Sequence, residues 1–154
     1  MLFRSISKLE GQEARASDEA FTAGMLHDIG KLVLAVNLAN EYAEAMRLSQ
    51  SGLELPVAEQ QVFGANHADV GGYLIGLWGL PVPVVEAVAL HHSPSRATQA
   101  GFSPLTSVHA ANVLEWERNR GAQGLPAPQL DDNYLGLVGV SSRLEGWRQA
   151  LAES

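Results

Sequence analysis

The pair His27-Asp28 lies inside a strongly apolar run that begins at Leu26. Burying a carboxylate is costly unless it is paired, hydrogen-bonded or bound to a metal ion. Any fold of this chain must therefore bring a compensating group to Asp28, and the adjacent imidazole suggests a metal ion. His67 and the pair His91-His92 are the further histidines that such a site would use.

The amino-acid composition and net charge indicate a globular domain and argue against nucleic-acid-binding and membrane proteins. The chain has 154 residues, of which 46% are hydrophobic and 18% charged, as in an ordinary single globular domain. With a net charge of −7 and no basic patch, we expect no nucleic-acid partner. No segment has the length and apolarity of a membrane span or the pattern of a secretion signal, so we expect no membrane partner and a cytoplasmic location.

The chain contains no cysteine, which excludes thiolate ligands. Any metal site must therefore use imidazole and carboxylate groups. A divalent transition metal such as iron or manganese suits such ligands, although no cofactor is required by the sequence itself.

The spacing of apolar residues predicts helices almost throughout and no strand. We expect an all-α, compact bundle of about six to eight helices, with Ser17, Asn40 and Asn66 as N-caps and a loop over residues 121–128. The expected helices span approximately residues 2–13, 18–38, 41–50, 56–63, 67–78, 83–92 and 104–119, followed by a helical tail over 130–152. The expected buried positions flanking the histidines are Phe21, Met25, Leu32, Val36, Val70, Leu74 and Leu77.

Each candidate residue also has an ordinary structural interpretation. His27 and Asp28 fit a hydrogen-bonded core pair, His67 fits a capping or core role, and histidines at a helix C-terminus interact favourably with its dipole. Lys31 either contacts a substrate phosphate or pairs with an acid at the surface. Asn112 points inward on the helix 104–119, where we expect it to satisfy buried polar groups.

The motifs occur in an order that resembles one family. Ala20 to Leu32 contains the His-Asp pair, and it is followed by residues 59–64, 66–71, 77–81 and 87–94. This series resembles the HDOD domains, bacterial signalling domains related to HD-type metal-dependent phosphohydrolases and to HD-GYP cyclic-di-GMP phosphodiesterases. The resemblance covers about residues 17–114, so we expect a single HD-type domain over 1–154 with its motif-bearing core at 17–119.

The resemblance implies that His27, Asp28, His67 and one of His91 and His92 are metal ligands. Both His91 and His92 therefore stay candidates. It also shows departures from the catalytic relatives. Residues 1–26 lack the first histidine of the HD enzymes, and Asn112 stands where their last aspartate is expected. Asp69 is a conceivable replacement carboxylate, but its position two residues after His67 directs it elsewhere. Ser93-Pro94-Ser95 replaces the Gly-Tyr-Pro element.

HDOD domains usually carry roughly another hundred residues of helices before this motif, so the resemblance predicts that this chain lacks the N-terminal half. A natural truncation, a wrongly assigned gene start and a deliberately shortened chain stay open as explanations. An apolar face exposed by such a truncation would favour a homo-oligomer.

Three functions follow from these observations. The first, which we favour, is a catalytically inactive regulatory or output module of two-component or cyclic-dinucleotide signalling. It would act through contacts with signalling proteins or with an appended receiver or sensor domain. The second is a metal-dependent phosphohydrolase or phosphodiesterase, with Lys31 near the phosphate. The third is a dimerising scaffold.

Overall fold

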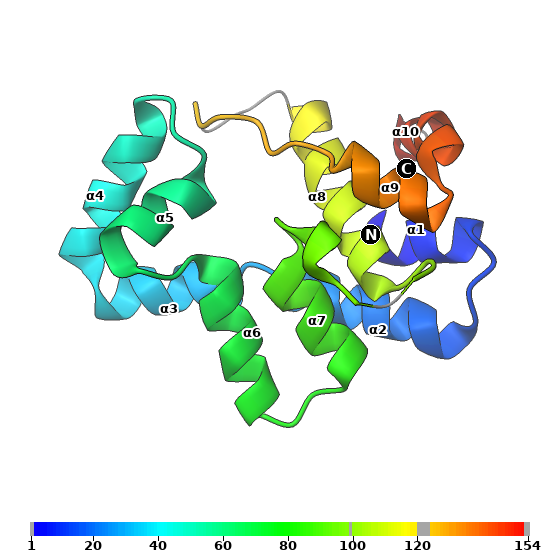
Figure 1. Cartoon of the computed structure of the whole chain (residues 1–154), viewed down its shortest axis with the longest axis horizontal. Coiled ribbons are helices and arrows are strands. Elements are labelled where there is room, and N and C mark those ends of the chain that lie inside the picture. The colour runs from blue at the N-terminus through cyan, green and yellow to red at the C-terminus, as the bar shows by residue number, and fades with distance from the viewer. Residues whose placement is uncertain (1, 99, 120–123, 153–154) are drawn as a thin grey trace.

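The computed structural model describes residues 2–98, 100–119 and 124–152, and all regular elements within these ranges are helical (Figure 1). The α-helices are α1 (Leu2–Leu9), α2 (Ala14–Leu26), α3 (Ile29–Asn37), α4 (Ala39–Gln50), α5 (Leu55–Phe63), α6 (His67–Leu77), α7 (Val82–Leu90), α8 (Pro104–Asn119), α9 (Asp132–Val138) and α10 (Leu144–Ala152). Two short 3₁₀ turns, η1 (Pro94–Arg96) and η2 (Ser141–Arg143), complete the set. The all-helical prediction is confirmed, with more helices than the six to eight expected.

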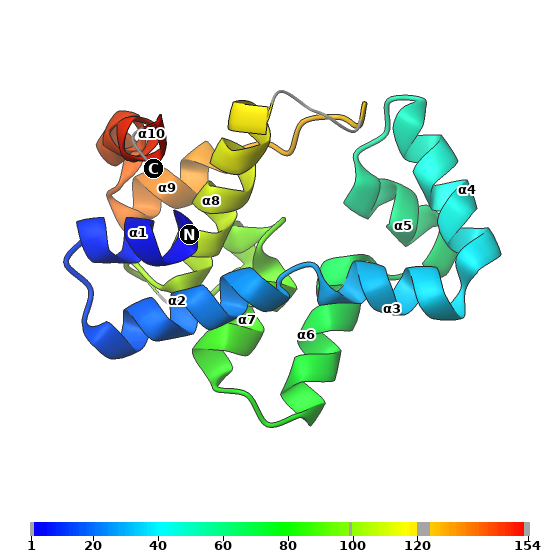
Figure 2. The same cartoon turned by 180° about the vertical axis from the view of Figure 1, so that it is seen from behind.

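One additional helix arises at the His-Asp pair. The continuous helix expected over 18–38 is wrong, because α2 ends at Leu26 and α3 begins at Ile29. Asp28 leaves the helical conformation, with φ −99° and ψ 7°, and Figure 2 shows the chain bending between the two helices. The bend lets Gly30 press against the carbonyl oxygen of His67, a contact that leaves no room for a Cβ atom.

Of the three predicted N-cap residues, one is confirmed and two are not. Asn66 caps α6 as expected, in a capping box with Asp69. Ser17, in contrast, lies buried inside α2, where its hydroxyl is 3.1 Å from that of Ser7. Asn40 lies within α4, whose N-cap is Leu38. A residue type that favours N-caps therefore acts as a cap only where the packing of the helices lets a helix begin at that residue.

Further helix ends differ from the sequence-based expectation. Helix α1 ends at Leu9 instead of residue 13. Helix α7 ends at Leu90, so His91 and His92 lie in the turn that follows it. Residues 121–123 of the expected loop 121–128 lie outside the described residues, and residues 124–128 contain no helix. The tail forms α9 and α10 as two short helices, as expected.

The core is centred on α8. This helix packs against α1, α2 and α7, and its residues from Pro104 to Ala111 are all buried. Trp147 of α10 closes one end of the core, where its Nε1–H donates to Glu10 across 2.8 Å. Helices α4 and α5 form a hairpin on the opposite side of the molecule (Figures 1 and 2). The candidate histidines lie between these two parts.

Several side chains expected in the interior are on the surface. The exposed fractions are 56% for Met25, 62% for Leu32, 73% for Val36 and 69% for Leu77. The close contacts are made instead by small residues, because Gly24 abuts Phe3 and Gly72 abuts Ala89 of α7. Helices that approach this closely turn their glycine and alanine faces inward and their larger apolar residues outward. None of the described helices combines the length and apolarity needed to cross a bilayer.

Candidate metal centre

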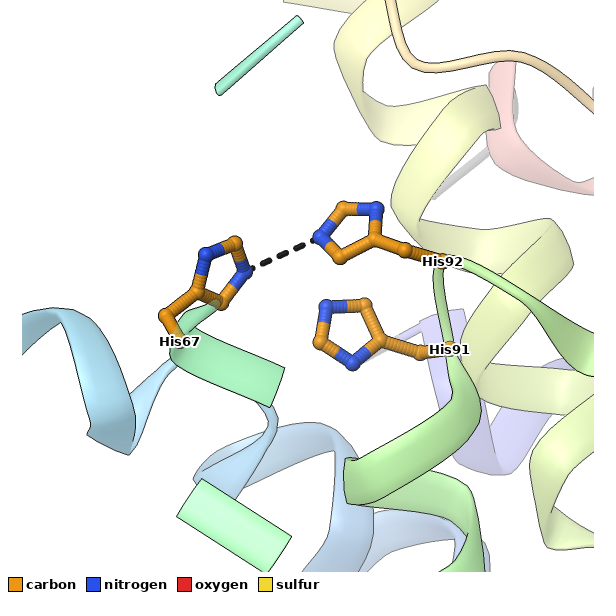
Figure 3. A group of neighbouring side chains, drawn as sticks. All are labelled: His67, His91 and His92. Atoms are coloured by element: carbon orange, nitrogen blue, oxygen red, sulfur yellow. Dashed lines mark hydrogen bonds between the residues drawn. The ribbon is translucent and has the colours of Figure 1, made fainter. Parts of the chain in front are cut away.

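The predicted ligands converge because each lies at the end of a helix. His27 follows the last residue of α2, Asp28 precedes the first residue of α3, and His67 begins α6. His91 and His92 follow α7. Packing of α3 and α7 against α6 brings these helix ends to one point. Figure 3 shows the rings of His67, His91 and His92 gathered there.

The protein fixes the tautomer of three of these histidines. The Nδ1 atoms of His27 and His91 lie 2.8 Å from the backbone carbonyl oxygens of Gly24 and Val88. The Nδ1 atom of His67 lies 2.6 Å from Glu59 Oε2. Because carbonyl and carboxylate oxygens only accept, Nδ1 carries the proton in each ring. In the neutral ring each Nε2 then keeps a lone pair, as in histidines that bind metals.

The donor atoms are close enough to share ions. His67, His91 and His92 offer one set of atoms within 4.8 Å of one another, and His27, Asp28 and His91 offer a second. The Nε2 atoms of His67 and His92 are 2.9 Å apart and share a hydrogen bond, which a metal ion between them would replace (Figure 3). Two nitrogens each about 2.1 Å from an ion, at a right angle, lie about 3 Å apart. The observed spacing fits ligands of one metal ion.

Two buried atoms of the cluster lack hydrogen-bond partners among the described residues, namely His91 Nε2 and Asp28 Oδ1. Asp28 Oδ1 lies 3.4 Å from His67 Nε2, which in the neutral ring is itself an acceptor. Leaving a buried acceptor unpaired costs about 1–3 kcal/mol. A cation between these atoms would satisfy both, so the residues present fit a bound divalent metal.

The electrostatics favour the ligating forms of most of these groups. Burial alone would raise the pKa of Asp28, but the contact with His67 and the charges of His27 and Lys31 outweigh it and hold that pKa far below its usual range. Burial and the neighbouring imidazoles lower the pKa of His91 strongly and that of His92 to about 2. The carboxylate is therefore ionised and these two imidazoles are neutral at neutral pH, as metal ligands must be.

Sequence reasoning missed Glu59. This carboxylate of α5 is fully buried, and its Oε2 accepts both from the backbone N–H of His67, at 2.8 Å, and from the ring. Burial opposes a charge on the His67 ring, but Asp28 and Glu59 outweigh it and raise the pKa of His67. The hint in the sequence was a glutamate beside Ala58 at a core position. Only the packing of α5 on α6 shows which residue it contacts.

A cavity of about 480 Å³ opens beside the donor atoms. Lys31 lines it with its Nζ 2.8 Å from Asp28 Oδ2, so the lysine pairs with an acid of the site itself. Asn112 and Trp116 of α8 form part of its wall, and Leu125, Pro126 and Pro128 also line it. A small charged ligand could thus reach the cluster from solvent.

Two other polar residues are excluded as ligands by their hydrogen bonds. Asp69 is held by the capping box with Asn66, which confirms that it faces away from His67. His109 uses both ring nitrogens, one toward the carbonyl oxygen of His91 and the other toward the N–H of Asp131. Neither residue belongs to a group of described donor atoms that could hold a metal ion.

Comparison with known proteins identifies the family to which this chain belongs. Residues 1–94, which contain α1 to α7 and the five candidate ligands, match the HDOD domain. The chain belongs to the HDOD family. Helix α8 with Asn112 lies beyond the matched residues of this HDOD protein.

Two known proteins are similar to the chain. A protein of Treponema pallidum (strain Nichols), described as uncharacterized, is 28% identical over 110 residues, which are 68% of the HDOD chain and 20% of that protein. A crystal structure from Shewanella amazonensis SB2B, described as "Putative phosphohydrolase", superposes with a TM-score of 0.76 at 21% identity and covers 99% of this chain and 55% of its own. The chain thus spans about a fifth of the first and about half of the second, and the second shares its fold.

Proposed function

We propose that this HDOD domain is a regulatory module of bacterial signalling that holds one divalent transition metal, such as iron or manganese, and turns over no substrate. The observation that supports the proposal is the number of imidazole ligands compared with carboxylate ligands at the cluster. Four imidazoles and a single carboxylate converge, while the part of the cavity wall formed by α8 presents the neutral amide of Asn112. A second ion would need further carboxylate, which an amide does not replace.

The ligands for the single ion would be His67, His91 and His92, supported by Asp28. Imidazole nitrogen suits transition metals better than magnesium or calcium, which prefer oxygen. When bound, such an ion acts as a Lewis acid and lowers the pKa of a coordinated water. Glu59 orients the His67 ring, and Lys31 holds the Asp28 carboxylate in place.

A metal-dependent phosphohydrolase is the second candidate. It is favoured by the open cavity, on whose wall Lys31 would meet a phosphate oxygen arriving at the metal. The likeness to the Shewanella structure is consistent with it at the level of the fold. His27 and Asp28 would then supply ligands to a second ion bound through His91.

The partners we propose are signalling proteins, or a receiver or sensor domain attached to the same polypeptide, with no role for nucleic acid or membrane. Large apolar side chains on the surface support protein contacts or a homo-oligomer. The exposed fractions are 72% for Tyr73, 58% for Trp78 and 75% for Val82, around the turn between α6 and α7. We propose that these contacts are made in the cytoplasm.

Elemental analysis combined with hydrolysis assays separates the two functions. We expect about one equivalent of metal in the wild-type chain, loss of that metal in Asp28→Ala, and no hydrolysis of bis(4-nitrophenyl) phosphate, nucleotides or cyclic dinucleotides. The matched control is Asp18→Ala, which removes an exposed carboxylate paired with Arg4 and should keep the metal. Metal-dependent hydrolysis that disappears in Asp28→Ala would establish the phosphohydrolase instead.

Adding a carboxylate to the cavity wall tests directly whether a shortage of carboxylate ligands limits the site to one metal ion. Asn112→Asp places a charged ligand on the cavity wall, and we expect its metal content to rise from one equivalent toward two. An unchanged content of one would show that the wall of α8 does not limit the second ion. Two equivalents already present in the wild-type chain would overturn the proposed single-metal module.

A further inference from the structure

His109 of α8 joins two backbone segments that are distant in sequence. It is buried, with its Nδ1 2.8 Å from the carbonyl oxygen of His91 and its Nε2 2.9 Å from the backbone N of Asp131. A carbonyl can only accept and a backbone N–H can only donate. The ring is therefore the neutral tautomer protonated on Nδ1, and its two hydrogen bonds are both satisfied.

One of these bonds sets the position of metal ligands. His91 is the C-cap of α7, and carbonyl groups at a helix C-terminus have no partner within the helix. His109 supplies that partner from α8. Because His92 follows directly, the hydrogen bond holds the whole turn that carries two candidate ligands.

The other bond reaches the C-terminal helices. Asp131 is the N-cap of α9, where its side chain accepts from the backbone N–H of Tyr134 at 2.9 Å. The same carboxylate accepts from the hydroxyl of Ser95 in η1, just after the ligand turn. The turn after α7 and the start of α9 are therefore joined twice, through His109 and through Ser95.

We infer that His109 is a positioning residue that couples metal occupancy at His67, His91 and His92 to the docking of α9. The inference rests on the proposed metal centre and states how metal binding there would change the structure at α9. A shift of the ligand turn moves the His91 carbonyl, and the buried ring transmits this movement to the Asp131 N–H. By linkage, docking of α9 strengthens metal binding by the same factor by which metal strengthens docking.

The test uses the full chain, with Co²⁺ as the metal, visible absorption to follow binding, and amide hydrogen exchange to follow α9. In the wild type, Co²⁺ should slow exchange at Asp131 and Tyr134 more than at amides of α4. His109→Phe keeps a ring of similar size but removes both hydrogen bonds. It should weaken Co²⁺ binding 10- to 100-fold, as loss of groups that orient ligands commonly does, and abolish the extra slowing at α9.

The control variant is Tyr134→Phe. It removes the 2.8 Å hydrogen bond between the Tyr134 hydroxyl and Thr106 Oγ1, which also joins α9 to α8 but does not involve His91. We expect it to speed exchange in α9 equally with and without Co²⁺ and to leave Co²⁺ affinity unchanged. This pattern separates coupling through His109 from a general weakening of the α8–α9 contact.

The wild-type chain alone can overturn the inference, even if His109→Phe does not fold. Co²⁺ binding that slows exchange in α9 no more than in α4 would refute the coupling and leave the metal centre standing. Wild-type affinity in a folded His109→Phe would refute it as well. A wild-type chain that binds no Co²⁺ would refute the metal centre and the coupling together.

Discussion

His67 donates its Nδ1 proton to Glu59 across 2.6 Å, and both side chains are buried. The pair joins α6, which carries a candidate ligand, to the hairpin of α4 and α5. A carboxylate behind a ligating imidazole fixes the orientation of the ring and raises its basicity. The proposed metal centre would therefore depend on a helix, α5, that contributes no ligand of its own.

Glu59→Gln tests this dependence. The amide keeps the size of the side chain but removes the charge, so we expect metal affinity to fall about 10- to 100-fold while the chain stays folded. Competition with a chelator of known affinity measures the change. Glu44→Gln is the control, because Glu44 is an exposed α4 carboxylate paired with Arg47. Equal affinities in the two variants would contradict the proposed role of Glu59.

Gly30→Ala tests the close approach of α3 to α6. The added Cβ would overlap the carbonyl oxygen of His67, which is backbone and cannot rotate away. We expect a loss of about 1–3 kcal/mol in the free energy of unfolding, measured by urea denaturation, together with weaker metal binding.

Gly146→Ala in α10 is the matched control for this substitution. Its Cβ meets nothing within 4 Å, so the alanine should stabilise the helix by up to about 1 kcal/mol. If Gly30→Ala unfolded no more easily than Gly146→Ala, the tight contact between α3 and α6 would be wrong.

Asp131 gives the unfolding free energy a dependence on acid pH. Burial opposes its charge, but the Ser95 hydroxyl and the Tyr134 N–H outweigh burial and lower the pKa of Asp131. Because this pKa lies below the unfolded value of about 3.9, the ionised group stabilises the fold above pH 4. That stabilisation is lost as the pH falls through the lower folded-state pKa.

Asp131→Ala should therefore cost about 1 kcal/mol of unfolding free energy at pH 7, the usual value of an N-cap, and less at pH 3. Urea denaturation at the two pH values measures both costs. Asp132→Ala changes the neighbouring exposed acid and should cost less at pH 7, since the capping bond belongs to Asp131. A cost for Asp131→Ala that does not shrink at pH 3 would contradict the assigned pKa direction.

Self-association is expected through the apolar residues around α6 and α7. Leu77→Lys replaces a side chain that is 69% exposed beside Trp78, and we expect light scattering to show a smaller average mass than for the wild type. Leu137→Lys is the control, with a side chain that is 84% exposed on α9. A wild-type chain that is monomeric at high concentration would rule out the homo-oligomer.

Local patterns in the sequence predicted most of the helices, but they did not predict every point at which a helix begins, ends or is interrupted. The Asn66 cap and the start of α8 at Pro104 were predicted because they depend on neighbouring residues alone. The break at His27-Asp28 was not, because apolar residues continue on both sides of it. Just after the break Gly30 meets His67, a contact between residues 37 positions apart that no local pattern indicates.

The sequence by itself determined the all-helical class, since helix periodicity is a local pattern, and its resemblance to HDOD domains supplied the five candidate ligands. Only the tertiary structure decided that Glu59 orients His67 and that His109 ties His91 to Asp131. The physical reason is the short range of hydrogen bonds. They require atoms within about 3 Å, and only the packing of separate helices sets such distances.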